Sequence, residues 1–441
     1  MQSKRVSNKL RVLQLTYRVP FPPTDGGAMG IYAITKGLKE NGATIDLLAI
    51  NTPKHAQPKG AMAEYANQID VFVDTRISSV KLLINLIFKT IPYNVERFYD
   101  KKVSQKLIEL LQANSYDFIQ VEGAFVAKYI EVIQQHSNRP IIIRAHNIEY
   151  IIWERLAVNT KNPLKKWFYN HLSKRLKAFE NKYYNLASGI AAITEEDKQR
   201  LLDMGITKPI KVIPAGVILD KYLQADLFTE KPNTIFSISA LDWAPNIEGL
   251  KWFLENVWNE LLQKHPEITL HIAGKSTPDW ILKLQLKNVF IHGFVEDAIA
   301  FKKSHQIMLV PLLSGGGMRV KIIEGMAAKK CIISSTIGAE GIAYTPNKNI
   351  VIADTPAEWI TAITHCLQNN DFRESIAAAA FDLVGSQYEN KAITQKYIDF
   401  YLINQTKNLK NLVEIKELKN EILITFFETK LQLLKELNLS V

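Results

Sequence analysis

The chain has 441 residues, of which 47% are hydrophobic and 22% charged; this suits two or three globular domains and excludes a fully disordered chain. The chain has only two cysteines, Cys331 and Cys366, which excludes a disulfide scaffold. No group of Cys and His residues has the spacing of a zinc site, which excludes a zinc site of that kind. No apolar run of about 18 residues is present, and residues 1–17 lack a signal-peptide core, so we expect a cytoplasmic protein. The net charge of +10 suits nucleic acid, an anionic membrane or a phosphate-bearing substrate without choosing among them.

The first half of the chain alternates short apolar segments with helical stretches. The stretch 29–42 has helical spacing and stops at Asn41-Gly42, a pair typical of a helix C-terminus. Such alternation predicts a parallel sheet in an α/β fold. Strands are expected at 11–17, 44–50, 71–73, 118–122, 141–146, 189–194 and 210–215.

The same pattern restarts near residue 225, after a polar stretch at 221–233 that we interpret as a linker. Two α/β halves that bind ligands beyond the carboxyl ends of their strands predict a single cleft between them. After about residue 385 the strands stop, and 386–405 and 410–439 look helical. In the second half, strands are expected at 234–239, 268–274, 288–293, 307–312, 331–335 and 349–353.

The most informative segment is 309–342, in which a strand runs into the glycine loop 314–317 and then into a helix with Arg319, Lys321 and Glu324. Glycines let the backbone approach a ligand, and the free N–H groups of a helix start favour a phosphate. Glu324, expected about two turns into the helix, is suited to accept both hydroxyls of a ribose. With a second glycine loop at 338–341, the segment predicts a nucleotide-diphosphate site; the alternative is a glycine-rich surface turn with a solvated basic face.

Two further loops carry candidate residues. Thr24-Asp25-Gly26-Gly27 lies too far from its strand for a dinucleotide fingerprint, and no acid ends the next strand, so a nicotinamide enzyme is disfavoured. This loop either faces the cleft or forms a mobile turn. His146 ends the strand 141–146 and is either a cleft residue or a structural histidine.

The stretch 161–184 concentrates positive charge, with seven basic residues, one acid and six interleaved aromatics. A basic amphipathic helix is typical of contact with an anionic membrane surface. The alternative is a solvated helix whose aromatic side chains pack on the core.

Taken together, these motifs resemble the retaining glycosyltransferases of family four, which have two facing Rossmann-like domains, the GT-B architecture. The resemblance covers about residues 10–405, and its carriers are 22–27 (PPTDGG), 144–147 (RAHN), 212–217 (VIPAGV), 243–246 (WAPN) and 315–342. The last resembles the subgroup pattern G-G-G-x-R-x-K-x-x-E-A-M-A. It implies an acceptor-side domain over 1–220, a nucleotide-sugar domain over 225–385, and C-terminal helices over 386–441 that begin by packing back on the N-terminal domain.

Carried onto this chain, the resemblance implies that Glu324 holds the donor ribose and that His146 lies beside the transferred sugar. Arg319 and Lys321 would stabilise the leaving diphosphate, replacing an Arg and a Lys that 237–241 lacks. Gly316 stands where the family commonly has a Glu that touches the donor sugar, so sugar contact must come from backbone N–H groups or elsewhere. The donor-binding set implied is Gly26, Gly27, Gly316, Gly317, Glu324, Gly338, Glu340, Gly341 and Ile342.

The implied activity is transfer of a sugar, with retained anomeric configuration, from a nucleoside-diphosphate sugar to a glycan or lipid-linked acceptor in cell-surface polysaccharide or glycoconjugate synthesis. No metal or cofactor is expected, because no Asp-x-Asp motif is visible, and the leaving β-phosphate would itself deprotonate the acceptor. The expected location is the cytoplasm, with possible peripheral contact to an anionic membrane and no nucleic-acid partner. The alternatives are a non-catalytic nucleotide-sugar-binding or scaffold protein, with 410–439 as a partner surface, and a nucleotide-sugar epimerase.

Overall fold

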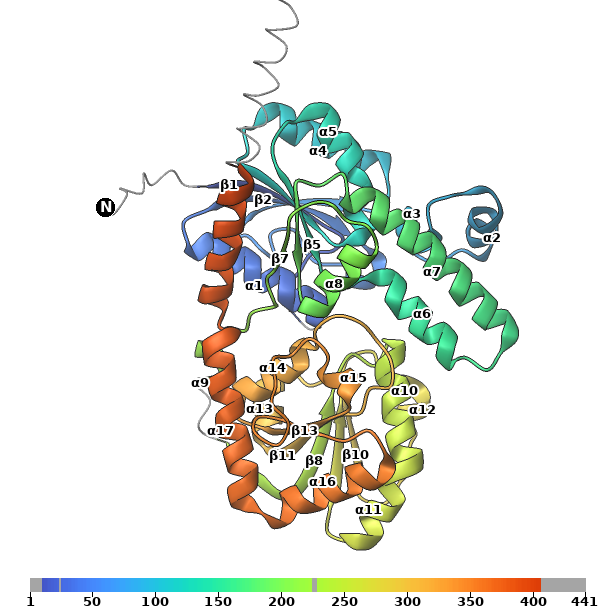
Figure 1. Cartoon of the computed structure of the whole chain (residues 1–441), viewed down its shortest axis with the longest axis vertical. Coiled ribbons are helices and arrows are strands. Elements are labelled where there is room, and N and C mark those ends of the chain that lie inside the picture. Colours follow the sequence, from blue (N-terminus) through green and yellow to red (C-terminus); the bar gives the residue numbers. More distant parts are fainter. Residues whose placement is uncertain (1–9, 24, 224–227, 406–441) are drawn as a thin grey trace, which may run out of the picture.

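The computed structural model describes residues 10–23, 25–223 and 228–405. It contains two parallel sheets, each in its own α/β unit, and the two units face each other along the long axis of the molecule (Figure 1). The predicted α/β class with two Rossmann-like halves is therefore confirmed. The predicted helix at 410–439 lies outside the described residues.

The N-terminal sheet has seven strands in the order β3-β2-β1-β4-β5-β6-β7. Its central strands are covered on both faces, which explains why β5 is apolar except at Arg144 and why all of its residues are buried. The strands are β1 (Arg11–Thr16), β2 (Thr44–Asn51), β3 (Asn67–Phe72), β4 (Phe118–Glu122), β5 (Ile141–Ala145), β6 (Gly189–Ala192) and β7 (Ile210–Val212). All seven predicted strands are present, with ends displaced by a few residues.

Helices of the N-terminal unit connect these strands. In α4, Val103, Leu107 and Leu111 recur every fourth residue and form its buried face. The helices are α1 (Gly26–Glu40), η1 (Pro53–His55), α2 (Ser79–Phe88), α3 (Tyr93–Glu96), α4 (Lys101–Ala113), η2 (Ala124–Tyr129), α5 (Ile130–His136), α6 (Glu149–Asn159), α7 (Pro163–Tyr184), α8 (Glu195–Asp203) and α9 (Asp220–Leu223).

The C-terminal sheet has six strands in the order β10-β9-β8-β11-β12-β13. They are β8 (Lys231–Ile238), β9 (Thr269–Ala273), β10 (Val289–Gly293), β11 (His305–Val310), β12 (Cys331–Ser334) and β13 (Val351–Ile352). All six were predicted from sequence. The expected linker 221–233 is shorter than predicted, because α9 extends to Leu223 and β8 already begins at Lys231; Pro232 lies near the strand start, where a missing N–H is tolerated.

Helices flank this second sheet as well. In α16, Thr355 and Glu358 form a capping box around the helix start, with Pro356 in the first turn. The helices are α10 (Ala244–Phe253), η3 (Leu254–Trp258), α11 (Asn259–Lys264), α12 (Asp279–Leu282), α13 (Ala298–Lys303), α14 (Val320–Ala327), α15 (Thr336–Ala339), α16 (Pro356–Gln368) and α17 (Asn370–Gln387).

After α17 the chain returns to the N-terminal unit as a helix over 390–405, which runs beside α1 in Figure 1. Asn390 Nδ2 donates to the carbonyl of Ala33 at 2.9 Å, and the rings of Tyr401 and Phe118 stack at 4.5 Å. A side chain at Gly37 would collide with Thr394, so a glycine allows this close helix contact. The described residues contain no helix that is both long and apolar enough to cross a membrane.

Candidate active site

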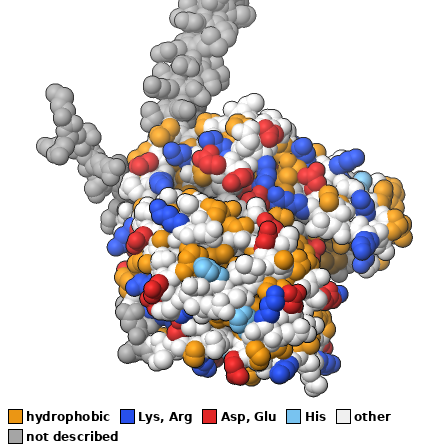
Figure 2. Space-filling model, turned by 60° about the horizontal axis from the view of Figure 1, so that its bottom comes forward, with side chains coloured by type: hydrophobic (Ala, Val, Ile, Leu, Met, Phe, Trp, Pro, Cys, Tyr) orange, Lys and Arg blue, Asp and Glu red, His pale blue; other side chains and the backbone are white. Residues whose placement is uncertain are grey.

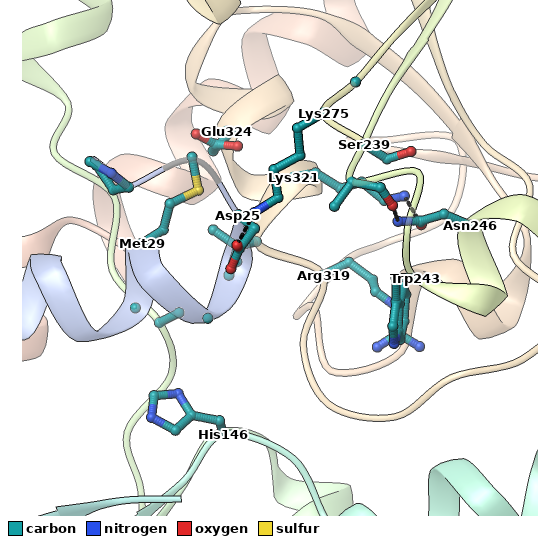
Figure 3. A pocket seen from close by; sticks show the side chains of 18 of the residues that line it. Asp25, Met29, His146, Ser239, Trp243, Asn246, Lys275, Arg319, Lys321 and Glu324 are labelled. Atoms are coloured by element: carbon teal, nitrogen blue, oxygen red, sulfur yellow. Dashed lines mark hydrogen bonds and ion pairs between the residues drawn. The ribbon is translucent and has the colours of Figure 1, made fainter. Parts of the chain in front are cut away.

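A cavity of about 470 Å³ opens between the two units. It lies beyond the carboxyl ends of strands from both sheets, where ligands of open parallel sheets bind. The N-terminal unit contributes the start of α1 and the segment after β5. The C-terminal unit contributes the ends of β8 and β9 and the start of α14, and Figure 3 shows their side chains converging on the cavity.

Asp25 forms the centre of a charged cluster on one wall. Its carboxylate caps α1 by accepting from the Ala28 N–H at 3.1 Å and is held by both Nη atoms of Arg18, at 3.0 and 2.9 Å. Lys275, at the end of β9, reaches across the cavity to pair with the same carboxylate (Figure 3). Burial alone would raise the pKa of Asp25, but Arg18 and Lys275 lower it well below its usual range. Asp25 is therefore ionised at neutral pH, and its carboxylate forms an ion pair with the Lys275 ammonium group.

Two helix starts meet at the cavity. A side chain at Gly26 would lie 3.6 Å from Val320, the first residue of α14, so the N-termini of α1 and α14 are neighbours across the two units. The free N–H groups and the dipole of each helix favour an anion there. At Gly27 an added side chain would approach the Tyr17 hydroxyl to 2.6 Å, which keeps this turn close to the cavity floor.

The Arg319 side chain stabilises the glycine loop that precedes it. Its Nη1 donates to the carbonyls of Gly316 and Gly317, and its guanidinium lies over the Trp243 ring at 5.7 Å. Burial lowers its pKa to about 10, with Arg155 and Arg200 contributing repulsion, so it stays charged at neutral pH. Its buried Nε–H has no hydrogen-bond partner within the described part of the chain.

Lys321 lies half-buried in the cavity wall, where its Nζ donates to Asn246 Oδ1 at 2.8 Å (Figure 3). Burial, helped by the neighbouring Arg319 charge, lowers its pKa to about 7. Near neutral pH it is thus only partly protonated. An anion in the cavity would restore its charge, since an opposite charge favours the protonated form.

Glu324 is the cavity's carboxylate on α14. It lies about one turn into the helix, because α14 begins at Val320; the sequence had suggested two turns. Tyr222 donates to its Oε1 at 3.0 Å, and Lys302 Nζ lies 3.3 Å from Oε2. A carboxylate has about four acceptor positions, so Glu324 keeps room for two ligand hydroxyls while its orientation is fixed.

His146 lies in the segment after β5, on the cavity side opposite Glu324 (Figure 3). Arg144, which only donates, lies 3.3 Å from Nδ1, so Nε2 carries the proton and donates to Glu122 at 2.7 Å. Burial and Arg144 lower the pKa of His146 despite the Glu122 carboxylate. The ring is therefore neutral with both nitrogens engaged, which suits a positioning role better than a general base.

Not all residues of the implied donor-binding and catalytic sets line this cavity. Gly26, Gly27, Gly316, Glu324, Arg319, Lys321 and His146 do, whereas Gly317, Gly338, Glu340, Gly341 and Ile342 do not. A side chain at Gly317, whose φ is +70°, would strike Asn147, so this glycine serves contact between the units. Gly338 is capped by Ser335 Oγ within α15, and Ile342 belongs to the core of the C-terminal unit.

Glu340 instead joins the two units. Arg155 on α6 forms a fork to its carboxylate at 2.7 and 3.0 Å, and Arg200 on α8 pairs with it as well. Burial would raise the Glu340 pKa, but the two guanidinium groups lower it to about 2. A second ion pair between the units, Lys54 with Asp242 at 2.7 Å, lies among the residues that line the cavity.

Sequence reasoning assigned no role to several cavity residues. Asp25 and Lys275 were noted only as loop or strand-end residues, and their pairing joins positions 250 residues apart, which no local pattern reveals. Trp243 and Asn246 belong to the 243–246 motif, which carried the family resemblance but to which the sequence analysis assigned no function. Tyr222 and Lys302 belong to no motif that the sequence analysis recognised. No cluster of three or more His, Cys, Asp or Glu residues suited to a metal ion occurs among the described residues.

Two sequence families match the chain. Residues 24–221 match "Glycosyltransferase Family 4", and residues 232–369 match "Glycosyl transferases group 1". A protein of Klebsiella pneumoniae described as an "Uncharacterized 44.6 kDa protein in cps region" is 21% identical over 87% of this chain and 97% of its own length.

Solved structures share the fold. Sucrose-phosphate synthase from Thermosynechococcus elongatus superposes with a TM-score of 0.65 at 13% identity, over 89% of this chain and 98% of its own. A glycosyltransferase from Rickettsia africae gives 0.63 at 18%, over 92% and 100%. Anabaena HepE in complex with UDP gives 0.61 at 15%, over 89% and 99%. The two matched domains and this shared architecture identify the chain as a glycosyltransferase of the family-four type with the GT-B fold.

Proposed function

We propose that the chain transfers a sugar from a nucleoside-diphosphate sugar to a hydroxyl of a glycan or lipid-linked acceptor, with retained anomeric configuration. The observation that carries this proposal is the composition of the cavity lining. It contains two helix N-termini and three cationic side chains, those of Lys275, Arg319 and Lys321. It also contains the carboxylate of Glu324 on α14, whose orientation is fixed by Tyr222 and Lys302. Positive charge for a diphosphate next to an acceptor for ribose hydroxyls matches the chemistry of such a donor.

In this proposal the diphosphate lies at the start of α14, with the ribose on Glu324. Lys275 leaves Asp25 for a phosphate oxygen, because a diphosphate offers it more negative charge than one shared carboxylate. Lys321 gains a proton as the anion enters. Structures of the same fold described as complexes with UDP and with UDP-glucose support a donor of this class.

In the transfer step, the acceptor oxygen forms a bond to the anomeric carbon as the bond from that carbon to the β-phosphate oxygen breaks. The acceptor proton passes to the leaving phosphate, which agrees with His146 having both nitrogens engaged. Lys275, Arg319 and Lys321 stabilise the charge that develops on the diphosphate. We propose that these cations fill the role that a metal ion has in other transferases and that no cofactor takes part.

The acceptor class is proposed from the relative described by its place in a cps region, which supports a role in cell-surface polysaccharide or glycoconjugate synthesis. A lipid-linked acceptor also fits peripheral contact of a cytoplasmic protein with an anionic membrane. The alternative, a non-catalytic nucleotide-sugar-binding or scaffold protein, would keep donor binding without turnover.

A panel of UDP- and GDP-sugars, assayed for nucleotide release with and without glycan or lipid-linked acceptors, tests the proposal. Turnover that depends on the donor and is accelerated by an acceptor supports glycosyl transfer, and NMR of the product gives its anomeric configuration. Donor binding with no release under any condition would favour the scaffold alternative. The variant Lys348→Met, which alters an exposed lysine outside the cavity, is the matched control for substitutions in the cavity.

A further inference from the structure

Helix α2 presents its apolar side chains to solvent. Val80, Leu83, Ile84, Ile87 and Phe88 are between 47% and 76% exposed. Their spacing of three and four residues places them in one stripe along the helix. Ile77, just before the helix, is also exposed. Six large hydrophobic side chains within 12 residues form a contiguous patch of the kind that marks an interaction site.

The inward side of α2 combines one buried polar residue with two half-buried leucines, Leu82 and Leu86. Asn85 is its one buried residue, and Asn85 Nδ2 donates to the carbonyl of Ile91 at 2.8 Å. Arg175 of α7 donates to Asn85 Oδ1 at 2.9 Å and to the carbonyl of Ile91 at 3.0 Å. These bonds orient the helix with its apolar stripe outward, so the exposure is a consequence of specific contacts.

The tip of the α6–α7 hairpin continues this surface. Leu164 and Trp167 are exposed there, and Lys165 and Lys166 lie between them. In Figure 1 α2 and this tip project from the same side of the N-terminal unit, and Figure 2 shows orange and blue side chains gathered on that projection. We call the surface formed by residues 77–89 and 161–167 the α2–α7 face.

The segments around this face carry mainly positive charge; two acids at their borders, Asp74 and Glu96, pair with Arg76 and Lys89. Residues 75–93 contain Arg76, Lys81 and Lys89 and no acid, and residues 161–178 contain six basic residues and no acid. Such a combination of an apolar stripe with surrounding Lys and Arg suits the boundary between acyl chains and anionic headgroups. A protein partner or a second copy would need a matching acidic rim, and the same face on a second copy would repel it.

The structure also corrects the simpler expectation for 161–184. Phe179, Tyr183 and Tyr184 are buried in the core, and only Trp167 among the six aromatics is exposed. The aromatic residues of that stretch therefore pack mainly inward, as the alternative interpretation held. The exposed apolar side chains of this region come mainly from α2, which the sequence analysis did not single out.

We infer that the α2–α7 face docks on an anionic lipid bilayer, with Leu83, Ile87 and Phe88 entering the interface and Lys81, Lys165 and Lys166 contacting headgroups. This inference goes beyond sugar transfer, since vesicle binding requires neither donor nor acceptor. It assigns a partner to a surface that lies away from the residues lining the active-site cavity.

Co-sedimentation of the full chain with vesicles tests it, using phosphatidylglycerol and phosphatidylcholine in about equal amounts against phosphatidylcholine alone. We expect binding to the anionic vesicles at least about tenfold stronger, and weaker at high salt. The variant Leu83→Ser/Ile87→Ser should lose at least about tenfold in binding. The control Leu202→Ser/Leu282→Ser, which changes two exposed leucines on α8 and α12, should bind as the unmodified chain does.

Undiminished binding by Leu83→Ser/Ile87→Ser, or no binding of the unmodified chain to either vesicle, would overturn the inference. Light scattering that shows a dimer converted to monomer by this variant would assign the face to self-association and overturn it as well. Calorimetry with UDP on the same variant should give the affinity of the unmodified chain. Failure of vesicle binding with intact UDP binding would thus refute the docking surface alone, whereas loss of UDP binding in the unmodified chain would refute the proposed function.

Discussion

The half-buried lysine Lys321 allows a quantitative prediction about donor binding. Its pKa is lowered to about 7 by burial and by Arg319. At about pH 8 it is roughly one-tenth protonated, and a diphosphate that raises its pKa by about two units makes it mostly protonated. Binding of UDP at this pH should therefore take up most of one proton, and UDP affinity should fall by up to about tenfold per pH unit above pH 7.

Isothermal titration calorimetry in two buffers of different ionisation enthalpy measures this proton uptake directly. Lys321→Met should abolish the uptake and flatten the pH dependence, whereas Lys348→Met should change neither. The terminal phosphate of UDP is already ionised at this pH, so it does not contribute uptake of its own. UDP binding with no proton uptake in the unmodified chain, or the same uptake in Lys321→Met, would refute the placement of the diphosphate beside Lys321.

Four further predictions rest on the same contacts. Because the pKa of Lys321 is lowered to about 7, the unfolded chain binds more protons than the folded chain between about pH 7 and 10.5, and the cost of burying the charged lysine is present in full below pH 7. Lys321→Met should therefore raise the melting temperature at about pH 6. An unchanged or lowered melting temperature would contradict this assignment. Glu324→Ala should weaken donor binding by about 2 kcal/mol or more, and Glu324→Gln by less, in calorimetry; unchanged affinity would show that the ribose lies elsewhere. Transfer should survive EDTA in the nucleotide-release assay, and loss restored by a divalent ion would reveal a metal requirement. Glu340→Gln should weaken the ion pairs between the units and increase the radius of gyration measured by small-angle scattering without ligand. An unchanged radius would show that the Arg155 and Arg200 contacts do not hold the cleft closed.

Much of the fold was predictable from local sequence because the strands of both sheets are short apolar runs bounded by turn residues. β5 and β12 are buried throughout, and apart from Arg144 each position in them is apolar or small, so the pattern is easy to detect. The glycine loop before α14 was equally clear, since few other arrangements place three glycines between a strand and a basic helix. These local signals located one wall of the cavity correctly.

The rest of the site depends on contacts between segments far apart in the chain. Glu340 belongs to a glycine loop that resembles a donor-binding segment, yet Arg155, 185 residues earlier, takes its carboxylate. The pairing of Asp25 with Lys275 is likewise set by how the two units face each other. For α2, periodicity defines an apolar stripe but not its direction; Asn85 and Arg175 decide that the stripe points outward.

A crystal structure with an unhydrolysed UDP- or GDP-sugar, chosen by calorimetry from the donor panel, tests the central claim most directly. The account predicts the diphosphate at the start of α14 within hydrogen-bond distance of Lys321 and Lys275, the ribose hydroxyls on Glu324, and the Asp25–Lys275 pair opened. A donor bound outside this cavity, or a bound donor with Lys275 still on Asp25 and Glu324 without a ligand contact, would contradict it.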